Sequence, residues 1–521
     1  MPSNTAPAIP DLSRRQLGQN VIANLSAFGL GIISAFFLTP FWIKKFGVAG
    51  YGIVPLVTNI VAYFTLISLM LNLSVGRFLT IAVGQKDYER AERIFNTSVF
   101  GAMAAGVVML CAGFCLWPFI GNLVRVPAGY GFELQIMFIL VLLTLVIATA
   151  STPFGVAMFC ANRLDLNSRI EIINRLIMIS VSTGLVVSVY PKPSALSAAA
   201  LVGSVYVVGA NYHYWRKLMP WMHLRLGNFD WRILKDQAVF GGWIVLNQMG
   251  AILFLYIDLF VVNRMVGPTA SGQYAVLLQW SVLLRSFSTA LAAPFAPATM
   301  HHFANGDTAA LVEHLRLAIR LMGFAVSLPV ILIAGFAKPL LGIWLGADFE
   351  SFAPLLTLII LPLAVNQSIM PLLALQQAMN KVKTPAIVTC LLGFANLGLA
   401  VILSGKGNLG MFGVAMAGAV TLSVKNLLFT TLYSAHILKK RWSFFVKETL
   451  QIATLMAFTT GVARVLAHLF EPRNWFGLLT LGTIAVGCYV ALAWCVLFTK
   501  KERNWIKEKL GIACSVKPVL S

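Results

Sequence analysis

Long apolar runs recur along almost the whole chain, and they restrict its fold more than any other feature. The run from Val239 to Met265 exceeds the about 20 residues that a helix needs to cross a bilayer. Similar runs, separated by charged residues or by glycine, proline and asparagine turns, predict about fourteen transmembrane helices. Charged residues make up 11% of the chain, against roughly 25% in soluble proteins. We therefore expect an all-α polytopic membrane protein.

The basic residues predict the orientation of the chain in the membrane. Lysine and arginine number 39 against 18 aspartates and glutamates, which gives a net charge of +21. In a soluble chain this excess would indicate a nucleic-acid partner, but cytoplasmic loops of membrane proteins are enriched in the same residues. An even number of helices places both termini on one side, and most of the basic residues fall on that side. The pattern predicts that both termini are cytoplasmic and that nucleic acid is not a partner.

Four pairs of residues keep an almost constant separation between the two halves of the chain. Two pairs are 220 positions apart and two are 218 apart: Gly47 with Gly267, Asp87 with Asp307, Pro153 with Pro371, and Asn162 with Asn380. This register predicts an internal repeat with six helices in each copy. Copies with an even number of helices are related by a pseudo-twofold axis along the membrane normal, and the substrate site of such a transporter lies in a central cavity between them.

The repeat divides the chain into six predicted parts. They are a cytoplasmic N-terminal segment (1–17), an N-lobe of six helices (18–215), a linker (216–237), a C-lobe of six helices (238–435), a further helix pair (449–498) and a basic cytoplasmic tail (499–521). The linker contains Trp221, Trp231 and several basic residues. This composition is typical of a segment that lies on anionic headgroups at the cytoplasmic surface.

Three segments resemble the multidrug/oligosaccharidyl-lipid/polysaccharide exporter superfamily, and within it the Wzx-type flippases. They are Pro40 with the segment FGVAGYG at 46–52, Tyr256-Ile257-Asp258 leading to Gly267 and Tyr274, and IWLGADF at 343–349. The resemblance covers roughly residues 15 to 440. It implies a flippase that moves undecaprenyl-pyrophosphate-linked oligosaccharide to the outer leaflet of a bacterial inner membrane by alternating access, for lipopolysaccharide or another polysaccharide. The last helix pair looks more like that of the related lipid II flippases, where it forms a groove for the lipid tail.

Ionisable side chains inside the apolar runs are the main candidate site residues, because a charge at the bilayer centre costs a few kcal/mol. Arg285 lies near the middle of its run, with Ser281 on the same helical face. It either lines a basic substrate cavity or forms an ion pair with Asp258. Lys425 either reaches the same cavity or extends toward the cytoplasmic edge. Asp258 either pairs with Arg285 or Arg264, which we favour, or takes up a coupling proton.

Amide side chains are the second group of candidates. Asn24, Asn59, Asn247 and Gln248 could bind sugar hydroxyls, although amides also favour packing between membrane helices. Arg77 is expected at the cytoplasmic end of its helix as an anchor or gate. Arg175 is also sorted to the cytoplasmic side, paired with Glu171 four residues earlier.

Catalysis is not expected, because the sequence contains no phosphate-binding glycine loop, metal-spaced histidine cluster or nucleophile triad. We expect no metal and no cofactor, and the seven cysteines show no disulfide framework. The expected partners are the lipid-linked oligosaccharide, membrane lipids and the polymerase or glycosyltransferases of the pathway, and the protein is expected to be a monomer.

Two other functions are compatible with a polytopic membrane protein. An ion-coupled multidrug exporter of the same superfamily would need intramembrane carboxylates, and the sequence offers essentially Asp258 alone. A membrane glycan polymerase or ligase would need a sizeable exterior loop or a cluster of catalytic carboxylates. The sequence has neither feature.

Overall fold

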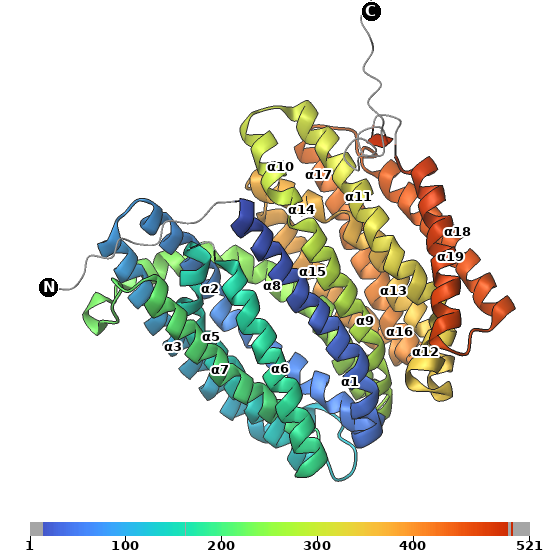
Figure 1. Cartoon of the computed structure of the whole chain (residues 1–521), viewed down its shortest axis with the longest axis horizontal. Helices are drawn as coiled ribbons and strands as arrows, with labels where there is room; N and C mark the ends of the chain where they lie inside the picture. The colour runs from blue at the N-terminus through green and yellow to red at the C-terminus, as the bar shows by residue number, and fades with distance from the viewer. Residues whose placement is uncertain (1–13, 162, 499–501, 504–521) are drawn as a thin grey trace, which may run out of the picture. The chain divides into compact units, whose positions relative to one another are not determined.

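A computed structural model describes residues 14–161, 163–498 and 502–503, and within these residues it is helical and contains no strand (Figure 1). Thirteen helices are long and apolar enough to cross a membrane. The first of them, Ser26–Ile67, includes a break at Gly47 and therefore covers two of the predicted helices. The all-α polytopic fold is confirmed. Most of the predicted terminal segments, 1–17 and 499–521, lie outside the described residues, as does Asn162.

The chain forms two compact units. The first contains residues up to 276 together with 386–414, and the second contains 277–385 together with residues from 415 onward. This partition differs from the lobes expected at 18–215 and 238–435, because α8 (Trp231–Met265) and most of α15 (Lys383–Ser404) belong to the first unit. The lobe boundaries remain a prediction.

The first unit is built from seven long helices and several shorter pieces. In chain order these are α1 (Arg14–Ala62), α2 (Thr65–Gly84), α3 (Tyr88–Leu116), η1 (Trp117–Phe119), α4 (Ile120–Leu123), α5 (Gly131–Cys160), α6 (Leu164–Ser188), α7 (Ser194–Leu218), η2 (Leu226–Asn228) and α8, followed by the start of α9 (Pro268–Ala292), most of α15 and the start of α16 (Gly410–Ser423). Phe95 of α3 anchors part of its core, because the ring stacks on Trp215 of α7 at 5.0 Å and meets Phe154 of α5 edge-on at 5.7 Å. These three aromatic rings join α3, α5 and α7.

The segment between α7 and α8 is fixed to the first unit by side-chain hydrogen bonds. The Asn96 amide donates to the carbonyl of His223 at 2.9 Å and accepts from the backbone N–H of Arg225 at 2.7 Å. Trp221 packs against Tyr88 with ring centres 4.9 Å apart. The linker was expected at 216–237, but α7 ends at Leu218 and α8 begins at Trp231. The connection between the two long helices is therefore shorter than the sequence indicated.

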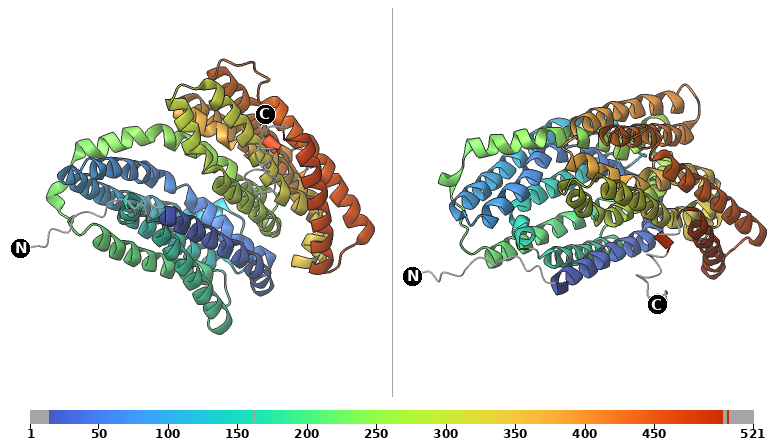
Figure 2. Two further views of the ribbon diagram at one scale, coloured as in Figure 1. Left: turned by 45° about the horizontal axis from the view of Figure 1, so that its top comes forward. Right: turned by 90° about the horizontal axis from the view of Figure 1, so that it is seen from above.

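The second unit begins within α9 and ends with an antiparallel helix pair. It contains the rest of α9, α10 (Phe295–Ala304), α11 (Thr308–Gly335), α12 (Ala337–Leu345), η3 (Ala347–Phe352), α13 (Ala353–Ser368), α14 (Met370–Ala378), most of α16, η4 (Val424–Thr430), α17 (Thr431–Ile437), α18 (Val446–Phe470) and α19 (Trp475–Val496). The last two helices lie side by side in all the views (Figure 2).

Positions paired by the sequence repeat share local structure. Gly47 and Gly267 both have positive φ, 72° and 137°, a backbone conformation that favours glycine. Asp87 accepts a hydrogen bond from the N–H of residue 90 at 3.0 Å and so caps α3, and Asp307 caps α11 in the same way through the N–H of residue 310 at 2.9 Å. The offset of 220 positions therefore joins residues with the same structural role.

Two further glycines at this offset lie against each other in the first unit. A Cβ atom placed on Gly52 would lie 2.5 Å from the Cα of Gly272, and a Cβ on Gly272 would overlap the carbonyl oxygen of Val48. The obstructing atoms belong to the backbone, so they cannot move aside as a side chain can. Close approach of these two helices therefore requires glycine at both positions.

We expect Gly272→Ala to lower the free energy of unfolding by about 1–3 kcal/mol, the usual cost of overpacking a tight contact. Gly29→Ala is the matched control, because Gly29 is also helical but has no atom within 4 Å of an added Cβ. That variant should be neutral or more stable by up to about 1 kcal/mol. Denaturation of both variants in mixed micelles measures the difference, and equal stabilities would contradict the close contact.

A network of buried charges fastens the last helix pair to the second unit. Glu448 of α18 is fully buried and accepts hydrogen bonds from Arg316 at 2.6 Å and from Arg320 at 3.1 Å, both on α11. Arg320 also binds Glu502 at 2.6 Å. Each buried charge in the network thus has at least one opposite charge beside it, and the attraction offsets the cost of removing the charges from water.

We expect Glu448→Ala to destabilise the protein by about 3–5 kcal/mol, because it removes the carboxylate that pairs with Arg316 and leaves Arg320 with Glu502 alone. Glu89→Ala is the control, since Glu89 forms an exposed pair with Arg93 at 2.5 Å and exposed pairs contribute about 0–1 kcal/mol. Chemical denaturation of the purified proteins in detergent compares them. A Glu448 variant as stable as the control would show that the network does not hold α18 in place.

Candidate functional site

Arg285 and Ser281 lie one turn apart on α9, within the second unit. The Ser281 side chain is buried, and its hydroxyl oxygen accepts a hydrogen bond from Nε of Arg285 at 3.3 Å. Arg285 itself is half-buried. The sequence placed these two residues on one helical face, and their hydrogen bond confirms that part of the prediction. The serine restricts the direction of the guanidinium.

Lys425 lies in η4, a π-helical segment of seven residues between α16 and α17. In this segment the hydroxyl of Thr430 donates to the carbonyl of Lys425 at 3.0 Å, five residues back. Segments of π-helix inside α-helices occur frequently at functional sites. The Lys425 ammonium lies close enough to Arg285 for the two positive charges to repel each other. The second unit therefore brings two of the predicted cations together.

Asn366 of α13 adds an amide beside the π-helical segment. Its Nδ2 donates to the hydroxyl oxygen of Ser423 at 3.3 Å, two residues before Lys425. Its Oδ1 is buried and has no hydrogen-bond partner among the described residues. The sequence analysis missed this residue, although the polar triplet Asn366-Gln367-Ser368 interrupts an otherwise apolar run and was the available signal.

Asp258 of α8 is buried in the first unit and has polar neighbours from three other parts of the chain. Its Oδ1 accepts a hydrogen bond from the amide of Asn396 on α15 at 3.2 Å. The side chains of Tyr63 and Tyr274 also lie close enough to interact with the carboxylate. Asn396 was not predicted, because only the fold brings α15 against α8. Whether Asp258 serves in an ion pair or in ion coupling stays a prediction.

The remaining predicted site residues also belong to the first unit. Asn247 is exposed on α8, and Gln248 and Asn59 are half-buried. Asn24 lies in α1 and Arg77 in α2, and their side chains are outside the described part of the structure. Within the described residues, histidine, cysteine and acidic side chains form no group of three or more that could hold a metal ion.

Arg175, which the sequence sorted to the cytoplasmic side, is a further cation within a long helix. The expected ion pair with Glu171 is present at 3.9 Å. However, α6 begins at Leu164, so Arg175 is near the middle of a 25-residue helix and about 16 Å from its start at 1.5 Å per residue. Its guanidinium packs on α1, where a Cβ added to Gly31 would lie 2.6 Å from Nη1.

No family model matches the chain. It is 33% identical over 492 residues to the uncharacterized membrane protein EpsK of Bacillus subtilis (strain 168), covering 94% of this chain and 97% of that protein. It is 22% identical over 432 residues to a protein of Shigella flexneri named "Putative O-antigen transporter", covering 80% and 97%.

Two solved structures share the fold. The lipid II flippase MurJ in an inward closed conformation matches with a TM-score of 0.68 and 16% identity, over 91% of this chain and 98% of that one. A multidrug resistance transporter of the MATE family, in an inward-facing conformation, matches with a TM-score of 0.63 and 15% identity, over 80% and 98%. The described helices therefore adopt the fold of known membrane transporters and flippases.

Proposed function

Because the chain belongs to the multidrug/oligosaccharidyl-lipid/polysaccharide exporter superfamily, whose members transport or flip their substrates across membranes, we propose that it is a flippase for lipid-linked oligosaccharide. Its substrate would be an oligosaccharide on undecaprenyl pyrophosphate, moved from the inner to the outer leaflet of the bacterial inner membrane for polysaccharide synthesis. The observation that carries the proposal is the interaction between Arg285 and Lys425 in the second unit.

Two positive charges held close together favour a ligand with more than one negative charge. Their mutual repulsion is stronger in a membrane protein than in water, because the effective dielectric constant is lower. A pyrophosphate group would remove this repulsion by interacting with both cations. The arginine can present two parallel N–H groups to phosphate oxygens, whereas the lysine acts as a point charge.

The neutral polar side chains suit the sugar part of such a substrate. The buried Oδ1 of Asn366 could accept a hydrogen bond from a sugar hydroxyl, which would satisfy an otherwise unpaired atom. Asn59, Asn247 and Gln248 of the first unit are at least partly accessible and offer further donors and acceptors. If the protein works by alternating access, the sugar would contact these side chains at different stages of the transport cycle.

Two of the named relatives support this substrate class, whereas the MATE transporter is named for multidrug resistance. The Shigella protein is named for O-antigen, and MurJ for lipid II, and both names refer to glycan-bearing molecules. A site with two cations that interact with each other would repel a cationic drug. Export of an anion from a cell with a negative interior is favoured by about 2.3 kcal/mol per charge per 100 mV. The membrane potential therefore favours the proposed direction of transport.

We expect Arg285→Ala and Lys425→Ala each to reduce glycan export at least about tenfold while leaving the protein inserted, since each removes a charge-assisted phosphate contact worth more than about 1.4 kcal/mol. Arg285→Lys should retain part of the activity. Lys447→Ala, at an exposed lysine near the start of α18, is the matched control and should export normally. Flipping of a fluorescent lipid-linked oligosaccharide in proteoliposomes measures the rate.

A double variant separates substrate binding from simple charge neutralisation. If Arg285 served only to neutralise Asp258, changing both residues to alanine would restore export. We expect the double variant to insert normally and to remain inactive. Normal flipping by that variant would falsify the assignment of Arg285 to the substrate site.

A further inference from the structure

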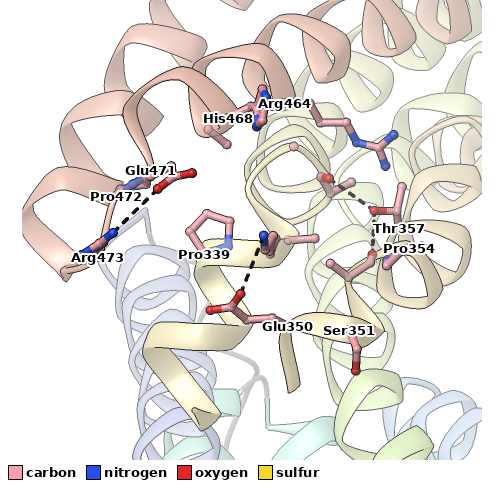
Figure 3. A pocket seen from close by; sticks show the side chains of 16 residues that line it. Pro339, Glu350, Ser351, Pro354, Thr357, Arg464, His468, Glu471, Pro472 and Arg473 are labelled. Atoms are coloured by element: carbon pink, nitrogen blue, oxygen red, sulfur yellow. Dashed lines mark hydrogen bonds and ion pairs between the residues drawn. The ribbon is translucent and has the colours of Figure 1, made fainter. Parts of the chain in front are cut away.

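A cavity of about 690 Å³ lies in the second unit between α18 and the neighbouring ends of α11, α12 and α13 (Figure 3). One wall is formed by the last two turns of α18 and the turn that follows it, and the opposite wall by the first turns of α12 and α13. The substrate residues proposed above, Arg285 and Lys425, do not line it. The cavity is therefore a separate candidate for ligand binding.

Arg464 is an exposed residue that lines this cavity and supplies positive charge to it. It lies six residues before the end of α18, or about 9 Å along the helix, and its side chain extends toward Thr357 (Figure 3). The guanidinium has no hydrogen-bond or ion-pair partner among the described residues. A charged residue in a transmembrane helix that faces a cavity is typically there for a ligand or a partner of opposite charge. The missing partner here is an anion.

Besides His468, which also lines the cavity, the other ionisable residues at the rim are arranged in two opposite-charge pairs. Lys338 lies 3.9 Å from Glu350, and Arg473 lies 3.8 Å from Glu471. Each carboxylate thus has a cation beside it, so neither is required to neutralise Arg464. With each pair counted as neutral, Arg464 leaves the cavity with a net positive charge close to one. One positive charge suits a phosphodiester better than a pyrophosphate.

Backbone groups at the cavity also favour an anion. The first turns of α12 and α13, with Lys338 and Pro354 among the lining residues, present the positive ends of two helices. Their N-cap residues, Phe336 and Phe352, have apolar side chains that make no capping hydrogen bond. In α13 the N–H of Ala353 donates to the carbonyl of Glu350 and Pro354 has no N–H, so the positive potential on this side comes mainly from the first turn of α12.

Exposed apolar side chains on the last helix pair, whose first helix forms one wall of the cavity, suit the acyl chains of a lipid. Val465 and Leu469 of α18 and Phe476 and Leu479 of α19 are exposed, with 58%, 68%, 81% and 66% of their surface accessible. A free phosphate would make no use of these residues. We propose that the cavity binds the phosphate of a membrane phospholipid, with Arg464 as the principal ligand and the acyl chains along the last helix pair.

Titration of phosphatidylglycerol into the delipidated full chain in detergent, followed by native mass spectrometry, tests the proposal. We expect Arg464→Gln to weaken the tightest binding about tenfold, equivalent to about 1.4 kcal/mol, and Arg464→Lys to weaken it less. Arg264→Gln is the matched control, because Arg264 is also an exposed arginine in the last turn of a transmembrane helix. This variant should bind phosphatidylglycerol as tightly as the unchanged protein does. Unchanged binding by Arg464→Gln would overturn the proposal.

Ala467→Leu provides a second variant that keeps every charge and fills part of the cavity. It should weaken phosphatidylglycerol binding as well, and normal binding by this variant would place the lipid elsewhere. Two further arms identify the source of the phosphate. Inorganic phosphate that displaces the lipid at equal concentration would indicate a free-phosphate site, and undecaprenyl pyrophosphate that binds more tightly through Arg464 would indicate a substrate site. Either result would overturn the phospholipid assignment.

Discussion

The cost of holding charge away from water determines how the ionisable side chains of this protein are arranged. Glu448 is fully buried and is compensated by two arginines of α11. Asp258 is buried as well, and the neighbours described for it include the amide of Asn396 and the phenol groups of Tyr63 and Tyr274. Arg285 and Lys425 differ from both, because they bring like charges together. The first arrangement stabilises the fold, whereas the last is the one that we propose for binding an anionic ligand.

Hydropathy was sufficient to predict the fold class and most of the helices, since a bilayer requires long apolar segments whatever their detailed sequence. The repeat added more local information, because glycines and capping aspartates at matching positions perform the same backbone role in both halves. Arg175 shows the limit of this approach. Its helix begins at Leu164, next to an ion pair between Arg163 and Asp165 at 2.9 Å. The first turns of the helix therefore contain polar residues and lie outside the apolar run.

The candidate site was only partly predictable for a related reason. Periodicity along one helix placed Ser281 beside Arg285, but it could not show that Asn396 contacts Asp258 or that Asn366 contacts Ser423. Those contacts join segments 138 and 57 residues apart and depend on the packing of the whole unit. The π-helical turn at Lys425 is also invisible to a pattern with a period of 3.6 residues, because it shifts the helical face within the segment.

The contact between Gly52 and Gly272 limits how this sequence can change over evolutionary time. The two positions are equivalent in the repeat, and each faces the backbone of the other copy. A larger residue at one position cannot be accommodated by a smaller side chain at the other, because no side chain is present to shrink. Compensation would require the two helices to separate, which would alter many other residues at once. A substitution at either position is therefore a change in the spacing of two whole helices rather than a local exchange of side chains.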